Sequence, residues 1–213
     1  MHDKRHRIVL LLFTIVFIVI GVWVAQIING TLPYADRWTR GLVDSLDHSY
    51  WYQAARFITE LGSRSFIIPL LLVMSIVLLI LFKDWFAAFM FAGGTIAAHT
   101  LNKLIKNLVD RERPSISVAA NAEGYSFPSG HAMISMVCYG LLGYFLVKRM
   151  KSSKAIMATQ LFFSLLVFLI GLSRYIINVH YLTDVMAGFV IGFICLIGII
   201  YLYEWIQKYR SRS

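Results

Sequence analysis

Three short polar stretches of this sequence carry residue types that could perform phosphoryl transfer. They are 106–114 (K-N-L-V-D-R-E-R-P), 128–131 (P-S-G-H) and 173–184 (S-R-Y-I-I-N-V-H-Y-L-T-D), and each adjoins a hydrophobic segment. A cation-rich pocket with two imidazoles and one carboxylate is what phosphoryl transfer through a histidine requires. The three stretches therefore predict a phosphatase that works at a membrane surface.

The stretch 173–184 holds a histidine and an aspartate at helical spacing. His180 and Asp184 are four residues apart, so on a helix their side chains would share one face, about one turn apart. The carboxylate could accept the Nδ1 proton and leave Nε2 as the nucleophile, with a phosphohistidine as covalent intermediate. Arg174 would lie in the preceding loop and point to the same place. Taken alone, the pair is a weak signal and is more often incidental at a helix start.

The stretch 128–131 reads as a turn that opens a helix. Ser129 can cap that helix, Gly130 allows close approach of the backbone, and free N–H groups at a helix start attract phosphate oxygens. His131 would lie at the membrane edge, where it could protonate the leaving oxygen as a general acid. The alternative is an ordinary helix start with an interfacial histidine.

The stretch 106–114 places two cations seven residues apart, with Lys106 at the outer end of a predicted span. An ammonium group and the guanidinium of Arg113 could hold the non-bridging oxygens of a phosphate and its transition-state charge. We expect the neighbouring Lys103 and Arg111 to reach toward the membrane surface and meet lipid headgroups instead.

The elements that must position these stretches are membrane helices. The chain is 59% hydrophobic with a mean hydropathy of +0.70, whereas soluble domains are about 45–50% apolar. We predict an all-α, six-span bundle forming one membrane-embedded domain over 1–213, with the first span retained and not cleaved as a signal peptide. The expected spans are 8–28, 66–82, 85–105, 131–147, 155–172 and 182–206.

Basic residues at the segment ends predict the orientation. The net charge of +9 is not gathered in one stripe, which favours a membrane surface over nucleic acid as the partner. Basic residues exceed acidic ones near the N-terminus, in the loop around 148–154 and near the C-terminus. The positive-inside rule then places both termini in the cytoplasm and all three polar stretches on the extracytoplasmic face.

The segment 29–65 is too polar to span a membrane. Apolar residues recur three and four apart within it, which predicts one or two short helices lying in the interface. They could be a simple cover for the bundle, or a lid or lateral gate for a lipid.

Three residues inside the predicted spans have two interpretations each. His99 could be a buried histidine bonded to a neighbouring helix or, less expectedly, a substrate contact. Gly188 and Gly192 form a G-x3-G pair that suits packing within the chain or between two copies.

The combination of the three stretches resembles the type 2 phosphatidic acid phosphatase family of membrane lipid phosphatases. Its motifs K-x6-R-P, P-S-G-H and S-R-x5-H-x3-D all match without substitution. The resemblance runs from about the second span to the sixth and implies six helices and dephosphorylation without metal or cofactor. It implies His180 as nucleophile, Asp184 as its partner and His131 as acid. Phosphate would be held by Lys106, Arg113, Ser129, Gly130 and Arg174.

These expectations favour an enzyme that hydrolyses a lipid phosphate monoester or terminal diphosphate. Its partners are then a membrane lipid and the bilayer, while the oligomeric state stays open. Undecaprenyl diphosphate, phosphatidylglycerol phosphate and phosphatidic acid all suit such a site. The alternatives are a lipid phosphotransferase that uses an acceptor other than water, and a non-catalytic lipid binder, scramblase or transporter.

Overall fold

The computed structural model describes residues 2–46, 49–114 and 124–210, and these ranges form eight α-helices with no strand. The prediction of an all-α protein is confirmed. In chain order the helices are α1 (His2–Ile28), α2 (Tyr34–Leu46), α3 (Tyr50–Glu60), α4 (Arg64–Phe82), α5 (Trp85–Val109), α6 (Gly130–Val147), α7 (Ser153–Ile176) and α8 (Leu182–Arg210).

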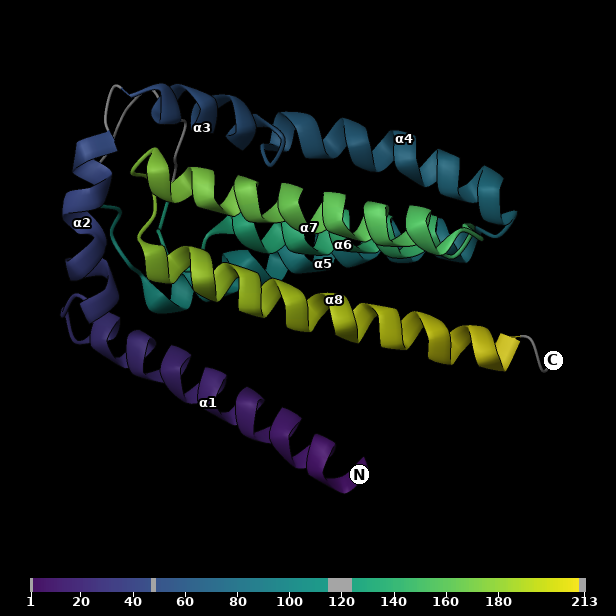
Figure 1. The fold of residues 1–213 in the computed structure, drawn as a ribbon, viewed down its shortest axis with the longest axis horizontal. Coiled ribbons are helices and arrows are strands. Elements are labelled where there is room, and N and C mark those ends of the chain that lie inside the picture. Colours follow the sequence, from purple (N-terminus) through teal and green to yellow (C-terminus); the bar gives the residue numbers. More distant parts are fainter. Residues whose placement is uncertain (1, 47–48, 115–123, 211–213) are drawn as a thin grey trace.

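Helix α6 forms the centre of the bundle and packs against α5, α7 and α8. It is apolar on all sides, and a helix with no polar face is stable only when it is surrounded by other helices or lipid. The neighbouring long helices run alongside it, while α1 diverges from the bundle (Figure 1). The buried core residues that α6 contributes include Met133, Val137, Cys138, Leu141 and Phe145.

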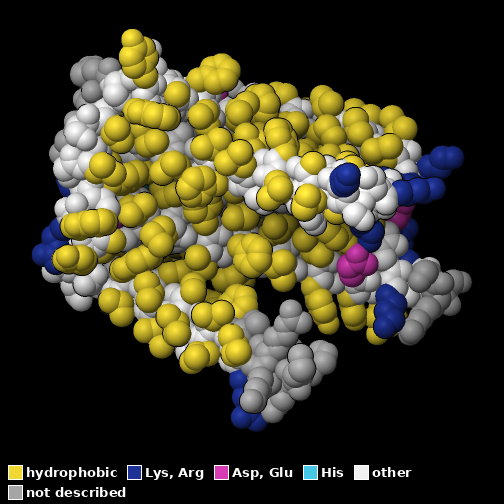
Figure 2. Space-filling model, in the orientation of Figure 1, with side chains coloured by type: hydrophobic (Ala, Val, Ile, Leu, Met, Phe, Trp, Pro, Cys, Tyr) yellow, Lys and Arg dark blue, Asp and Glu magenta, His cyan; other side chains and the backbone are white. Residues whose placement is uncertain are grey.

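Five helices of the described chain are long and apolar enough to cross a membrane: α1 from Leu10 onward, α4, α6, α7 and α8. Hydrophobic side chains cover most of the face in Figure 2, and the charged ones visible there lie mainly near the ends. The chain is therefore a multi-pass membrane protein. The remaining predicted span, 85–105, corresponds to α5, which is not among the five and whose apolar run contains His99, Asn102 and Lys103.

The G-x3-G pair of α8 serves packing within the chain. A Cβ atom on Gly188 would lie 2.7 Å from the Ser129 carbonyl oxygen, and one on Gly192 would lie 2.8 Å from the Met133 carbonyl oxygen. Real Cβ atoms do not approach that closely, so the two glycines let α8 lie directly against the start of α6. This contact brings the first turn of α8 beside the first turn of α6.

The predicted interfacial segment 29–65 forms the two short helices α2 and α3, which cover one end of the bundle (Figure 1). Helix α2 packs on α7 and α8, and α3 packs on α7. Their outer sides leave Trp38, Trp51 and Phe57 exposed. The two helices predicted for this segment are confirmed, while its role, as a cover or as a lid or gate, stays a prediction.

Candidate active site

The three polar stretches meet at the end of the bundle that α2 and α3 cover. Helices α5 and α7 end there, and α6 and α8 begin there (Figure 1). A cavity of about 350 Å³ opens between these helix ends. Its lining includes most of the predicted site residues, namely Lys106, Arg113, Gly130, His131, Arg174 and His180. The two others, Ser129 and Asp184, are fully buried beside it.

His180 presents its Nε2 atom to a guanidinium group. It lies in the turn between α7 and α8 and is 3% exposed. Nη1 of Arg113 lies 3.2 Å from Nε2. Because arginine can only donate hydrogen bonds, Nε2 must be the acceptor and the imidazole proton belongs on Nδ1. This is the tautomer in which Nε2 can act as a nucleophile.

The relationship between His180 and Asp184 differs from the prediction. The two do not share a helix face, because His180 precedes α8 and Asp184 lies in its first turn. Nδ1 is 3.5 Å from Asp184 Oδ2. The hydroxyl of Ser126 lies 3.3 Å from Nδ1 and also donates to that carboxylate, so the histidine and aspartate are coupled through a serine as well as directly. The sequence motifs gave no sign of Ser126, which stands two residues before P-S-G-H.

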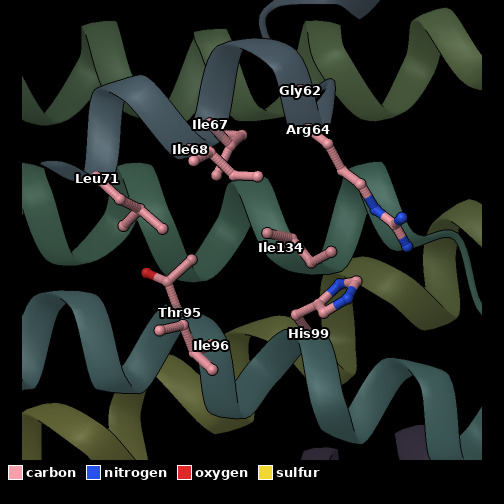
Figure 3. Close-up of a pocket in the computed structure, with 9 residues that line it drawn as sticks. All are labelled: Gly62, Arg64, Ile67, Ile68, Leu71, Thr95, Ile96, His99 and Ile134. Carbon is pink, nitrogen blue, oxygen red and sulfur yellow. The ribbon is translucent and has the colours of Figure 1, made fainter.

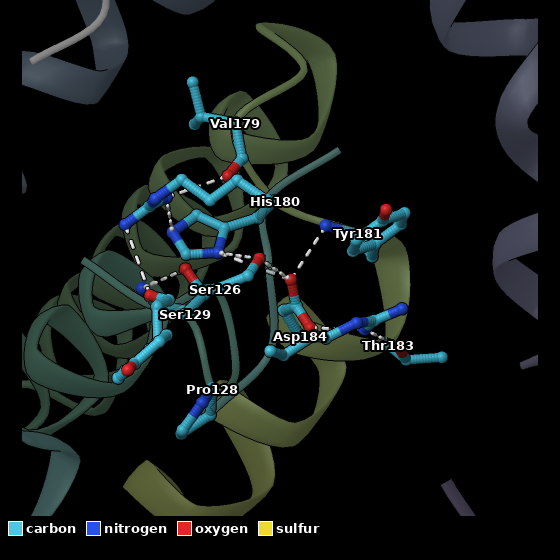
Figure 4. Close-up of polar contacts among 12 residues, drawn as sticks. Ser126, Pro128, Ser129, Val179, His180, Tyr181, Thr183 and Asp184 are labelled. Atoms are coloured by element: carbon cyan, nitrogen blue, oxygen red, sulfur yellow. Dashed lines mark hydrogen bonds and ion pairs between the residues drawn. The ribbon is translucent and has the colours of Figure 1, made fainter. Parts of the chain in front are cut away.

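The carboxylate of Asp184 is held in place by the backbone of its own turn. The N–H of Tyr181 donates to Oδ2 at 2.9 Å, and the N–H of Ser129 donates to the Asp184 carbonyl oxygen at 2.9 Å. The second of these bonds ties the start of α8 to the start of α6. The histidine, its carboxylate and the P-S-G-H turn are thus one connected unit (Figure 4).

The ionisation of the site favours an anionic ligand. Burial, followed by the charges of Arg113 and Lys106, holds the pKa of His180 well below its ordinary value, so the imidazole is neutral near pH 7. Burial and the charge of Arg113 lower the pKa of Lys106, which lies just beyond the predicted span 85–105, to about 7. Burial also lowers the pKa of Arg113. Burial is the first cause of each shift, and a bound phosphate would offset it by pairing with the buried cations.

Backbone carbonyl groups orient two of the cations. Nε of Arg113 donates to the Gly124 carbonyl oxygen at 2.9 Å, and its Nη1 donates to that of Val179 at 2.8 Å. The ammonium group of Lys106 donates to the Tyr125 carbonyl oxygen. These bonds hold both charged ends at the cavity wall, where they can reach a ligand.

Arg174 lies in the last turn of α7 and not in the following loop, which corrects the sequence prediction. Its Nη1 donates to Oγ1 of Thr59 in α3 at 2.9 Å. Its Nε is buried and has no hydrogen-bond partner among the described residues. An unpaired donor on a buried guanidinium group is costly, and in this cavity a phosphate oxygen would satisfy it.

The P-S-G-H turn folds as predicted. The Ser129 hydroxyl accepts from the N–H of Ala132 at 3.5 Å and so caps α6. A Cβ atom on Gly130 would lie 3.1 Å from Oδ1 of Asn102 in α5, so glycine allows α6 to start close against that helix. The free N–H groups of this first turn are therefore at the cavity.

His131 faces the cavity from the first turn of α6. The turn between α3 and α4 presses against it, since a Cβ atom on Gly62 would lie 2.8 Å from its Cδ2. The close approach fixes the imidazole on the side of the cavity nearest α4. His131 and His180 thus line the same space from different helix ends.

A sequence profile of the PAP2 superfamily matches residues 85–208. This chain belongs to the PAP2 superfamily. It is 32% identical over 157 residues to phosphatidylglycerophosphatase B of Bacillus subtilis strain 168, covering 73% of this chain and 76% of that protein. The protein is therefore a PAP2 membrane phosphatase, a hydrolase that acts on lipid phosphoesters.

Two solved structures resemble this PAP2 phosphatase. The crystal structure of a transmembrane PAP2-type phosphatidylglycerolphosphate phosphatase from Bacillus subtilis superposes with a TM-score of 0.75 at 25% identity, covering 89% of this chain and 96% of that one. The structure of Aquifex aeolicus LpxE superposes with a TM-score of 0.54 at 23% identity, covering 75% of this chain and 91% of that one. The second likeness concerns the fold alone.

Arg111 of this PAP2 phosphatase is buried, so the prediction that it meets lipid headgroups is wrong. It is 6% exposed. Its Nη1 lies 2.5 Å from Asp184 Oδ1, its Nη2 lies 2.8 Å from Asp36 Oδ2, and its guanidinium lies over the Tyr181 ring at 3.8 Å. Arg111 thus pairs with two buried carboxylates at once, one through each Nη atom, and does not reach the membrane surface.

Asp36 brings helix α2 into the same network. It is 2% exposed, and besides Arg111 it accepts from the N–H and the hydroxyl of Thr183 at 3.0 and 2.6 Å. Helix α2 is thereby tied to the residue that precedes Asp184. The family motifs did not indicate this connection, because Asp36 lies outside them.

Proposed function

We propose that this PAP2 phosphatase hydrolyses a lipid phosphate monoester or terminal diphosphate through a phosphohistidine at His180. The observation that carries the proposal is the unprotonated Nε2 facing Arg113 in a cavity rich in cations. Nε2 attacks the terminal phosphorus, and the bond from phosphorus to the lipid oxygen breaks. That oxygen leaves with a proton from His131.

The second half of the reaction restores the histidine. His131, now neutral, takes a proton from water while the water oxygen attacks the phosphorus of phosphohistidine. The bond between phosphorus and Nε2 then breaks, and inorganic phosphate leaves. Throughout, Asp184 and Ser126 keep the proton on Nδ1 and stabilise the charge that develops on the ring.

The phosphate oxygens are bound by positive charge that the chain itself supplies. Lys106, Arg113 and Arg174 line the cavity, and Gly130 brings the backbone of the first turn of α6 to it. Such preorganised donors stabilise the charge of a phosphoryl transition state. We therefore propose that turnover needs neither a metal ion nor another cofactor.

The membrane placement completes the proposal. Residues 85–105 of α5 would form the remaining span, and α5 packs against α4, α6 and α8. The N-terminal end of α1 and the C-terminal end of α8 both point away from α2 (Figure 1). With the basic ends in the cytoplasm, the cavity would face the extracytoplasmic side.

The candidate substrates are phosphatidylglycerol phosphate, undecaprenyl diphosphate and phosphatidic acid. The first is suggested by the similarity to phosphatidylglycerophosphatase B.

The test uses purified protein in detergent with EDTA and lipids labelled with ³²P in the terminal phosphate. We expect release of inorganic phosphate and, on alkaline quenching, a base-stable and acid-labile label on the wild-type protein. His180→Ala should lose both while still binding lipid, and His131→Ala should form and hydrolyse the phosphoenzyme more slowly. Unchanged turnover in His180→Ala would contradict the proposal.

A further inference from the structure

A second, apolar cavity adjoins the catalytic one. Its volume is about 220 Å³, and it lies between α4, α5 and α6 with Ile67, Leu71 and Ile96 on its walls. The catalytic cavity and this apolar groove share four lining residues, so they meet and are not separate sites. The shared residues are Gly62, Arg64, His99 and Ile134.

Two side chains that can donate hydrogen bonds, Arg64 and His99, lie where the two cavities meet. Arg64 begins α4 and His99 comes from α5, and their side chains project toward the same end of the groove (Figure 3). Neither makes a hydrogen bond or ion pair with another described residue. His99 therefore lacks the predicted hydrogen bond to a neighbouring helix. It is half-buried and lines both cavities.

A lipid bound across both cavities would pass this junction. Its terminal phosphate would lie at His180 and its chain would lie in the apolar groove, whose walls are mainly apolar side chains. The part of the lipid between its terminal phosphate and its chain would then lie beside Arg64 and His99. Unpaired donors at the edge of an apolar groove gain most from a charged acceptor.

We propose that Arg64 and His99 form a subsite for a second phosphate of the lipid. The substrates would then carry two phosphates, as a lipid diphosphate or phosphatidylglycerol phosphate does, whereas phosphatidic acid has nothing to place there. The inference rests on the proposed function. Glu60 also lines the catalytic cavity, but the cations Lys106, Arg113 and Arg174 outnumber it, so the junction still favours an anion.

The experiment compares kcat/KM for two-phosphate lipids and for phosphatidic acid of matched chain length. A lost hydrogen bond to a charged group corresponds to roughly a 10- to 100-fold effect. We expect Arg64→Gln to lower kcat/KM for undecaprenyl diphosphate and phosphatidylglycerol phosphate by about 10-fold or more, and to change that for phosphatidic acid less than about 2-fold. His99→Phe should act in the same direction. The matched control is Lys103→Gln, an exposed cation one turn further along α5 that lines neither cavity.

The outcomes separate this inference from the proposed function. An equal loss on all three lipids, or no loss on the two-phosphate lipids, would overturn the second subsite and leave the phosphatase intact. Failure of the wild-type protein to release phosphate from any of them would instead count against the proposed function. Since Arg64 is exposed in the structure, its replacement should leave the melting temperature unchanged.

Discussion

Nη1 of Arg111 lies 2.5 Å from the Asp184 carboxylate, so the partner of the proposed nucleophile is itself held by a buried cation. The other side of the same guanidinium binds helix α2 through Asp36. The position of the carboxylate therefore depends on a helix that lies outside the family motifs. Catalytic groups must be held within about 0.5 Å of their productive positions, so the contacts that hold the Asp184 carboxylate should affect turnover.

Neutralising Asp36 or Arg111 should lower turnover more than it weakens substrate binding. We expect Asp36→Asn to reduce kcat about 10-fold with KM changed less than about 2-fold, because only the placement of Asp184 changes. Arg111→Gln should also unfold more readily, since removing one partner of a buried ion pair costs about 3–5 kcal/mol. The control is Asp84→Asn, whose carboxylate pairs with Arg210. Steady-state kinetics and thermal melts check this, and a rise in KM with constant kcat would contradict it.

Ser126 should contribute to the chemistry through the Asp184 carboxylate. Removing its hydroxyl in Ser126→Ala leaves the direct 3.5 Å contact between His180 and Asp184, so we expect a modest loss of about 10-fold in kcat. Asp184→Asn removes the charge and should cost about 10²–10⁴-fold. Rapid-quench measurement of phosphoenzyme formation would show both effects in the first step. A larger loss for Ser126→Ala than for Asp184→Asn would reverse the assigned roles.

The His180 imidazole should be neutral, with its proton on Nδ1. Burial and then the charges of Arg113 and Lys106 depress its pKa well below the ordinary value. The neutral form is therefore favoured, and it should persist as the pH falls through about 6.5, where a free histidine gains its proton. ¹⁵N NMR of histidine-labelled protein checks this, with the signal assigned by its loss in His180→Gln. Protonation of Nε2 near pH 6.5 or above would be the opposite result.

A side chain at Gly62 should disturb His131. The added Cβ in Gly62→Ala would lie 2.6 Å from Ile170 Cγ2 and 2.8 Å from His131 Cδ2, so the imidazole or the turn must shift. We expect kcat to fall about 10-fold or more, because the acid is no longer placed for the leaving oxygen. The matched control is Gly41→Ala in α2, where the new Cβ meets nothing within 4 Å. Equal activity of the two variants would show that the contact does not matter.

The proposed orientation predicts which loops a membrane-impermeant maleimide can reach. In a background with Cys138 and Cys195 replaced, Tyr50→Cys in α3 should react in intact spheroplasts, since its side chain is 90% exposed beside the site. Lys151→Cys, in the loop between α6 and α7, should react only after permeabilisation. The reverse labelling pattern would place the site on the cytoplasmic side.

The helices and most of the predicted site residues that line the cavity could be read from the sequence alone. Long apolar runs require helices in a membrane because backbone groups must bond within the segment, so the α4, α6, α7 and α8 segments were predictable to within a few residues. The spans and the basic residues at their ends likewise predicted that His131 and His180 would be near the same membrane face. The apolar runs and the charges at their ends are local features, and local features can be recognised in a single sequence.

Only the tertiary structure decided the contacts that join distant segments. The pairing of Asp36 with Arg111 spans α2 and the end of α5, and a sequence cannot show that two charges will be buried together. Because His180 ends up in a turn before α8, its Nδ1 meets Ser126 as well as Asp184, which helical spacing could not predict. The meeting of the catalytic cavity with the apolar groove at Arg64 and His99 has the same origin. Such contacts depend on how helices pack, and packing is a property of the whole bundle.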